Sequence, residues 1–176
     1  MLKNITGLLI ITTALELTGC ASNASVDQMV YKSNTSEKPQ KVTLVNNIAV
    51  STVTGGTETN PLWISKINDA NFKSALEQSL QQANLYHVIN GEKYQLQANL
   101  LKVEQPFIGL NFKVVCYAHY KLKDKKSNKV IFDKDITSSY TATFNDSPIG
   151  MVRLKIANEG AARENFQKLI KELYHL

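Results

Sequence analysis

The stretch FKVVCYAHYKLK (residues 112–123) alternates between two kinds of side chain and therefore predicts a β-strand. Every second residue is apolar or aromatic and is expected to face a core: Phe112, Val114, Cys116, Ala118, Tyr120 and Leu122. The residues between them are expected to point away from that core: Lys113, Tyr117, His119 and Lys121. A strand with one apolar face indicates a sheet that is covered on one side only.

Three more strands are predicted on either side of this stretch, at residues 41–54, 94–105 and 130–144. Residues 86–89 are interpreted as a short extended segment. Two helices are predicted from apolar residues at helical spacing, one from Asn68 or Asp69 to Asn84 and one over 149–173. Gly160 in the second helix predicts a close approach of that helix to the sheet.

This order of elements predicts an α+β fold. We expect a two-layer sandwich, in which a mainly antiparallel sheet of about four strands carries both helices on one face. The chain has 176 residues, which is enough for one domain with a real core and too few for two.

A short apolar segment near the N-terminus ends in Leu-Thr-Gly-Cys, residues 17–20. The segment is too short to span a bilayer, which needs about 20 apolar residues. The pattern resembles the lipobox of bacterial lipoproteins, although Glu16 departs from it. This resemblance implies that residues 1–19 are a signal peptide and that Cys20 becomes an acylated N-terminus. The alternatives are an ordinary secretory signal that contains a cysteine and a buried N-terminal helix.

The lipoprotein interpretation divides the chain into a signal peptide (1–19), an acylated Cys20 with a flexible tether (20–40) and a globular domain (41–176). The partner of Cys20 is then the lipid bilayer. Ala21 follows Cys20, whereas Asp at this place is the usual signal for retention in the inner membrane of two-membrane bacteria. The resemblance therefore implies the outer membrane, with the domain facing the periplasm.

The net charge of +5 is mildly basic, and no interleaving of aromatic and basic residues favours a nucleic-acid partner. Once Cys20 is acylated, Cys116 is the remaining thiol, so no disulfide forms within one mature chain. We expect Cys116 to be a buried small apolar residue, with a reactive thiol or an intermolecular disulfide as the alternative.

Three loops are predicted to share one edge of the sheet, at 55–65, 106–110 and 147–151, provided that 86–89 is not a full strand. Each loop carries apolar residues beside Pro or Gly, which is unusual for simple connections. The hypothesis is a contact patch for an envelope protein or a lipid, made by Trp63, Phe107, Ile108, Leu110, Ile149 and Met151. The alternative is that these residues fold back and close the end of the core.

The other end of the sheet carries five lysines around one hairpin turn: Lys121, Lys123, Lys125, Lys126 and Lys129. The predicted tether enters the first strand at this same end, so the lysines are expected to lie near anionic lipid. The alternative is a solvated hairpin whose charges discourage pairing between sheet edges.

No catalytic motif is present, and the histidines His87, His119 and His175 lack the spacing of metal ligands. We therefore expect no enzyme activity, no metal and no cofactor. Glu104 and Asp146 are the carboxylates nearest two of the apolar loops and form the one candidate acid–base pair. An unrecognised hydrolase or transferase that uses this pair is the least favoured hypothesis.

Three stretches resemble a family of small, poorly characterised bacterial lipoproteins: NPLW (60–63), NFKSALEQSL (71–80) and ANEGAAREN (157–165). The predicted layout is also loosely similar to accessory lipoproteins of outer-membrane assembly, including the lipopolysaccharide-assembly lipoprotein. The resemblance implies a non-enzymatic accessory or binding module of the cell envelope. A structural or surface-exposed lipoprotein without a specific ligand is the alternative.

Overall fold

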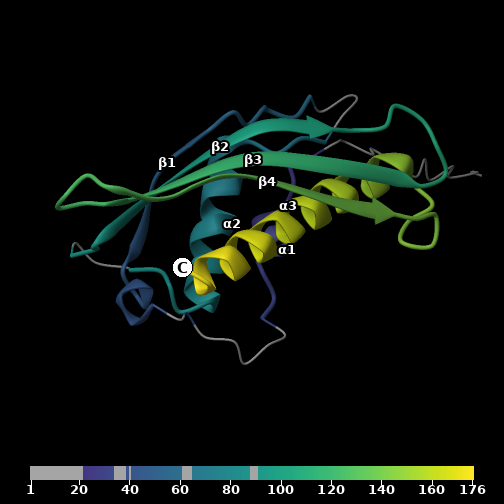
Figure 1. The fold of residues 1–176 in the computed structure, drawn as a ribbon. Helices are drawn as coiled ribbons and strands as arrows, with labels where there is room; N and C mark the ends of the chain where they lie inside the picture. The colour runs from purple at the N-terminus through teal and green to yellow at the C-terminus, as the bar shows by residue number, and fades with distance from the viewer. Residues whose placement is uncertain (1–21, 34–38, 40, 61–64, 88–90) are drawn as a thin grey trace, which may run out of the picture.

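The structure is a computed structural model that describes residues 22–33, 39, 41–60, 65–87 and 91–176. Its sheet has the order β1 (Ile48–Thr54), β2 (Tyr94–Glu104), β3 (Phe112–Asp124) and β4 (Val130–Ala142). The β1–β2 pair is parallel, and the two other pairs are antiparallel. Figure 1 shows that both long helices, α2 (Asp69–Gln82) and α3 (Gly150–Tyr174), lie on the same side of this sheet. The predicted α+β sandwich with a mainly antiparallel sheet is therefore confirmed.

The core lies between the sheet and the two helices, and β3 is the strand that contributes most to it. The alternation predicted for this strand is confirmed, because Val114, Cys116, Ala118, Tyr120 and Leu122 are fully buried. The rings of Phe72 from α2 and Phe166 from α3 meet beneath the sheet, with their centroids 4.8 Å apart. The hydroxyl of Tyr120 donates a hydrogen bond to the Asn165 side chain at 2.7 Å, so this buried phenol has the partner it requires.

The helix α2 begins and ends as the sequence predicts. The side chain of Asn68 accepts a hydrogen bond from the Asn71 amide at 2.9 Å, and Asn84 follows the helix in the left-handed region, with a φ of 55°. The close approach of α3 to the sheet is also confirmed at Gly160. A Cβ at this position would lie 2.2 Å from the Tyr140 ring on β4.

The first strand is shorter than predicted. Residues 41–47 form a short 3-10 helix, η1 (Val42–Leu44), and a turn with Asn46 at φ 50° before β1 begins at Ile48. The amides of Asn46 and Asn47 donate to the carbonyls of Asn84 and Leu85, which draws this part of the chain away from the sheet. Tyr86 forms an isolated bridge with Ile48, while 88–90 lie outside the described residues.

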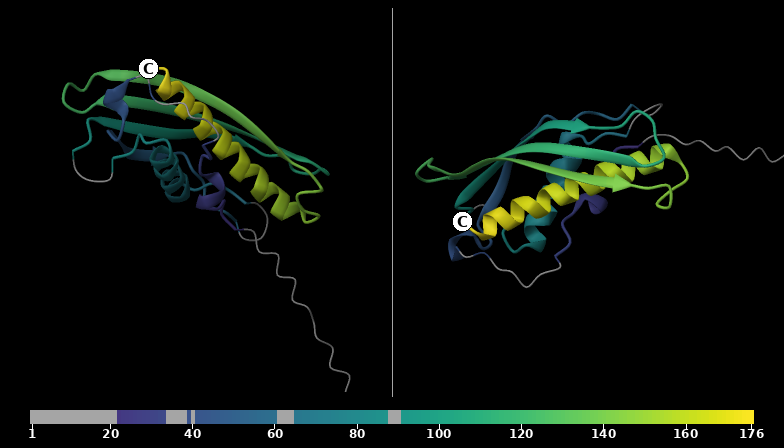
Figure 2. Two further views of the ribbon diagram at one scale, coloured as in Figure 1. Left: turned by 90° about the horizontal axis from the view of Figure 1, so that it is seen from below. Right: turned by 45° about the vertical axis from the view of Figure 1, so that its right-hand side comes forward.

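The predicted flexible tether is wrong for residues 22–33. This segment contains the short helix α1 (Val26–Met29), which packs in the helical layer against α2 and α3 (Figure 2). Ala24 and Met29 are fully buried, and Tyr31 is nearly so. The apolar run Met29-Val30-Tyr31 provides the buried contacts. The surrounding residues are mostly polar, and this composition led to the prediction of a tether. The remaining tether residues 34–38 and 40 lie outside the described residues, as does Cys20.

Within the described part of the chain, no helix is both long enough and apolar enough to cross a membrane.

Candidate functional site

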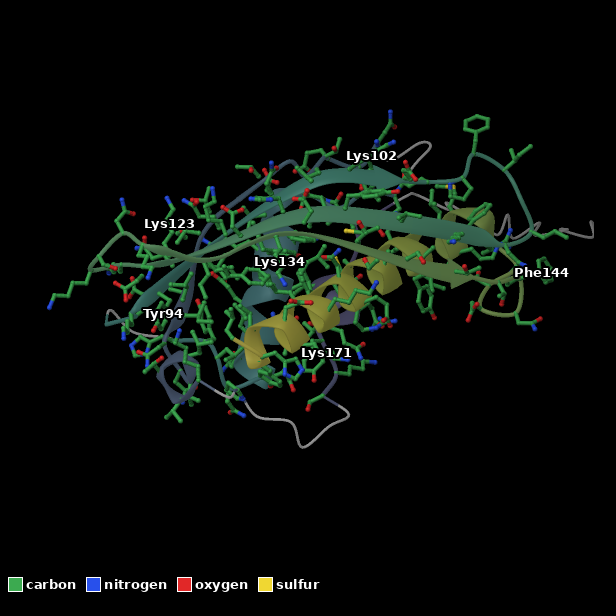
Figure 3. All side chains as sticks on the ribbon, in the orientation of Figure 1. Tyr94, Lys102, Lys123, Lys134, Phe144 and Lys171 are labelled. Atoms are coloured by element: carbon green, nitrogen blue, oxygen red, sulfur yellow. The ribbon has the colours of Figure 1, made fainter. Side chains whose placement is uncertain are left out.

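The three predicted loops do meet at one edge of the molecule, which we call the loop edge. It is the edge where β1, β2 and β4 end and β3 begins, on the right in Figure 1. The parallel β1–β2 pair produces this arrangement, because α2 returns the chain to the start of the sheet before β2 rises. Figure 3 shows Phe144 at the loop edge and Lys123 at the opposite end.

An open groove of about 740 Å³ lies at the loop edge, between these loops and the start of α3. We call it the edge groove, and its described lining is Asn60, Lys66, Gln105, Pro106, Phe107, Phe112, Gly150, Met151 and Leu154. Its apolar lining residues include Phe107 and Met151 and the mostly buried Phe112 and Leu154. A mainly apolar groove with a few amide and ammonium groups at its margin suits the binding of an apolar ligand.

The loop between β2 and β3 carries the most exposed apolar side chains of the edge. Phe107 is 93% exposed, Ile108 81% and Leu110 74%. Ile149 is about half exposed and Met151 is half-buried. The alternative that these side chains fold back into the core is therefore wrong for Phe107, Ile108 and Leu110. Trp63 lies outside the described residues.

A buried group of amides fixes the base of this loop. Gln105 donates from Nε2 to the Ser65 carbonyl at 2.9 Å and to Oδ1 of Asn158 at 2.7 Å. Asn158 donates from Nδ2 to the same Ser65 carbonyl at 2.9 Å. Asn158 is fully buried on α3, so these bonds hold two of the three loops in place against the helix.

Arg153 joins the loop at 147–151 to the loop at 106–110. Its side chain is almost completely buried, and it donates to the carbonyl of Ser147 at 2.7 Å and to that of Gly109 at 3.4 Å. The guanidinium lies over the rings of Phe112 and Phe144, at 5.1 and 5.5 Å from their centroids. No described carboxylate pairs with Arg153, and its Nε has no hydrogen-bond partner among the described residues. Cation–π contacts thus replace an ion pair in supporting this charge.

The sequence pointed to none of these buried polar groups as parts of the site. Arg153, Asn158 and Glu159 occupy a stretch of α3 that also carries apolar residues at helical spacing. The signal that was available is the stretch 157–165, where Asn158, Glu159 and Asn165 interrupt an otherwise apolar face. Polar residues on a buried face need hydrogen-bond partners. Asn158 has them in the loops, Glu159 in the N-terminal segment and Asn165 in strands β3 and β4.

The carboxylates Glu104 and Asp146, the least favoured acid–base candidates, have separate hydrogen-bond partners. A hydrogen bond from Lys102 at 2.6 Å lowers the pKa of Glu104, which also accepts from Tyr117. Hydrogen bonds from Thr143, the backbone amide first, lower the pKa of Asp146. Neither carboxylate lines the edge groove. Both carboxylates have a lowered pKa, whereas a general acid at neutral pH needs a raised one. Their hydrogen bonds stabilise local structure.

The histidines and the thiol also lie apart from the groove. His119, on the open face of the sheet, contacts Asp133 at 3.0 Å and Asp135 at 2.6 Å. Cys116 faces the core, where burial raises its pKa to about 12, so the prediction of a buried and inert thiol is confirmed. Among the described residues, no group of three or more His, Cys, Asp or Glu side chains is arranged to hold a metal ion.

The lysine hairpin lies at the end opposite the loop edge, and it is partly neutralised. Lys125 pairs with Glu92 at 2.7 Å and Lys121 with Asp133 at 3.1 Å, whereas Lys126 and Lys129 are exposed. The chain does enter β1 at this end, as predicted, because Ile48 is level with Tyr94 and with Asp124 beside the hairpin. The first described residues, however, lie at the other end. Ser22, the first residue of the described chain, is bonded to Ser65 and Lys155 at the loop edge.

Comparisons with known proteins find the same fold at low sequence identity. Protein XCC0632 from Xanthomonas campestris, of the DUF330 family, is 11% identical with a TM-score of 0.54, over 82% of this chain and 94% of that one. PelC from Paraburkholderia phytofirmans, crystallised as a dodecamer, is 16% identical with a TM-score of 0.51, over 81% and 96%.

A predicted lipoprotein from Caulobacter crescentus is 15% identical with a TM-score of 0.50, over 74% of this chain and 89% of that one. No protein-family model matches the chain, and no curated protein matches it. At these identities the structural likeness shows the fold alone, and the Caulobacter crescentus protein that shares it is described as a lipoprotein.

Proposed function

We propose that this protein is a bacterial envelope lipoprotein, anchored through acylated Cys20, that acts as a non-enzymatic binding module. The observation that carries the proposal is the edge groove, bordered by the exposed side chains of Phe107, Ile108 and Leu110. Exposed apolar groups gathered at one place are a mark of contact sites, because an isolated soluble domain gains nothing from leaving them in water.

The support for the anchor is the Leu-Thr-Gly-Cys sequence before the domain, together with a fold that is found in proteins described as lipoproteins. Several acyl chains on one cysteine give stable anchoring, because each buried methylene contributes about 0.8 kcal/mol. Ala21 favours the outer membrane, with the domain on its periplasmic side.

The support for binding rather than catalysis is the chemistry of the groove. Its polar lining consists of Asn60, Lys66 and Gln105, and Gln105 is already committed to Ser65 and Asn158. Amide and ammonium groups orient a ligand, whereas proton transfer needs a base near its working pKa. The ligand that this lining favours is an apolar chain or an apolar protein segment.

The test of the anchor is membrane fractionation of the wild type and of Cys20→Ala, each expressed as the full chain. We expect the wild type in the membrane fraction, with a mass that includes acyl chains, and the Cys20→Ala protein in the soluble fraction. An unmodified Cys20 in membrane-purified protein would overturn the anchor.

The test of the groove places a photo-crosslinking amino acid at Met151, with Lys126 on the lysine hairpin as the matched exposed control. We expect crosslinked products from position 151 in living cells and none from 126. Met151→Glu should abolish binding without loss of stability, because an acidic residue in the first turn of α3 is favourable there. Equal crosslinking at both positions would contradict the proposal.

A further inference from the structure

We infer that the loop edge rests on the bilayer that holds Cys20, and that Phe107, Ile108 and Leu110 insert into its lipid–water interface. The inference rests on the proposed function and names membrane phospholipid as the partner of the exposed loop. It follows from three features of the described residues: where the chain enters the domain, how short the link to Cys20 is, and what the loop exposes.

The first feature is the attachment of the N-terminal segment at the loop edge. The Ser65 hydroxyl donates to the Ser22 carbonyl at 2.7 Å, and the Lys155 ammonium donates to the Ser22 hydroxyl at 2.9 Å. The Thr59 amide donates to Asn23 at 3.1 Å. Ala24 is fully buried, and its amide donates to the Lys66 carbonyl at 3.0 Å. Residues 22–24 are therefore fixed at the loop edge.

The second feature is the reach of the remaining link. Cys20 precedes Ser22 by two residues, and two residues span at most about 7 Å. Hydrogen bonds continue from Ser22 through Ser65 to Gln105, which lies two residues before Phe107. An acyl chain on Cys20 is thus tied to the same edge as the exposed loop, so the bilayer and the loop cannot lie at opposite ends of the molecule.

The third feature is the chemistry of the loop edge. Three large apolar side chains, at 93%, 81% and 74% exposure, stand on a loop whose Gly109 carbonyl is held by Arg153. Lys102 pairs with Glu104 at 2.6 Å and Lys155 lies 3.9 Å from Glu159, so the charges at this edge are mixed. Insertion therefore depends on apolar burial and not on anionic lipid, and it should persist at high salt.

The experiment attaches an environment-sensitive fluorophore to the acylated protein, which begins at Cys20, in vesicles of phosphatidylethanolamine and phosphatidylglycerol. One variant carries Ile108→Cys, and the matched control carries Lys126→Cys at the far hairpin. Cys116 does not compete for the label, because it is buried and its pKa is raised to about 12. Lipids with a nitroxide near the headgroup serve as the quencher, and vesicle sedimentation reports the anchor separately.

We expect quenching at position 108 to exceed that at 126 at least threefold, in low salt and in 0.5 M salt alike. Protein that sediments with vesicles but shows equal quenching at both positions overturns membrane docking and leaves the anchor intact. The loop would then be free for a protein partner. Protein that carries no acyl chains and does not sediment overturns the anchor and the docking together.

Discussion

At the scale of single residues, Gly160 shows how closely α3 lies against the sheet. The helix interior normally disfavours Gly by about 1 kcal/mol relative to Ala. Here the missing side chain leaves space for the Tyr140 ring, which a Cβ would approach to 2.2 Å. The contact is with the base of the ring, so the whole Tyr140 side chain would have to move.

Gly160→Ala should therefore lower the free energy of unfolding by about 1–3 kcal/mol, because overpacking outweighs the gain in helix propensity. Urea denaturation followed by circular dichroism measures the change. Gly150→Ala is the control, because its Cβ would lie 3.7 Å from Phe112, an ordinary contact. Additive effects of Gly160→Ala and Tyr140→Ala would show that the two residues do not interact in this way.

Glu159 is a second residue whose environment makes a measurable prediction. Burial raises the pKa of Glu159 above its ordinary value of 4.5, although the Ser25 amide donates to it at 2.7 Å and Lys155 lies nearby. Because the folded state holds this proton more strongly than the unfolded chain does, its contribution to stability falls as pH rises from 4.5 through the raised pKa.

The change Glu159→Gln keeps the shape and removes the titration. We expect the variant to gain stability relative to wild type as the pH is raised from 4 to 7, with the smallest difference at pH 4. Thermal unfolding over this range measures the difference between the two proteins. A difference that does not change with pH would show that burial does not penalise the carboxylate.

At the scale of elements, α1 changes the nature of the N-terminal segment from a linker to a part of the core. Met29 is fully buried between the helices, and the Tyr31 amide donates to the Ser79 hydroxyl at 2.9 Å. The Arg163 guanidinium, from α3, donates to the Gln28 carbonyl. The segment is thereby held from both α2 and α3.

Met29→Ala should cost about 2–5 kcal/mol of unfolding free energy, which is typical of a large side chain removed from a core. Val42→Ala is the matched control: its side chain is 79% exposed, and the change should lie within about 0.5 kcal/mol of zero. Chemical denaturation of the two variants decides between a packed segment and a tether, since a tether would tolerate both changes equally.

The two loops joined by Arg153 should loosen when that side chain is replaced. In Arg153→Met, the carbonyls of Ser147 and Gly109 lose a charged donor, and bonds of this kind contribute about 1.5–3 kcal/mol. Amide hydrogen exchange in 105–111 and 143–149 should rise at least about tenfold. Arg163→Met, which removes a bond to α1, should leave exchange in these loops unchanged.

At the scale of the whole molecule, the docked loop edge sets the orientation of the domain. The strand β3 has 13 residues and runs from the loop edge to the lysine hairpin, a length of about 44 Å at 3.4 Å per residue. An upright domain therefore holds its exposed lysines far from the lipid, well beyond the Debye length at physiological salt.

A linker of ten Gly and Ser residues inserted after Ala21, together with Phe107→Ser, Ile108→Ser and Leu110→Ser, should release the domain from this orientation. Energy transfer from a label at Lys126→Cys to a dye in anionic vesicles should be weak in the original protein. It should rise in this variant, because the lysine hairpin is then free to approach the lipid. High salt should reverse the rise, and a signal that is the same in both proteins would contradict the proposed constraint.

Most of the architecture could be predicted from the sequence because apolar residues recur at regular strand and helix spacings. The alternation at 112–123 and the cap at Asn68 are local signals, and both correspond to observed contacts. The shared edge of the three loops followed from strand directions alone. The role of 22–31 could not be predicted in this way, because its four-residue helix buries only a few apolar side chains within a polar stretch.

The hydrogen bonds of the buried polar residues at the site could not be predicted from the sequence either. Arg153 and Asn158 act through contacts with Gly109, Ser147, Ser65 and Gln105, which lie between 6 and 93 positions away along the chain. Periodicity identifies the helix that carries them but gives no information on which loops they bind. Exposure of Phe107 likewise depends on how Gln105 and Arg153 hold the loop on either side.

The attachment of Ser22 to Ser65 and Lys155 has a consequence for how far the proposed lipoprotein can act. Only two residues separate Ser22 from the acylated Cys20, so the domain cannot move away from the membrane across the periplasm. A partner protein must therefore lie in the same leaflet or reach that membrane surface. A molecule that links this domain to the cell wall must itself span the distance from the wall.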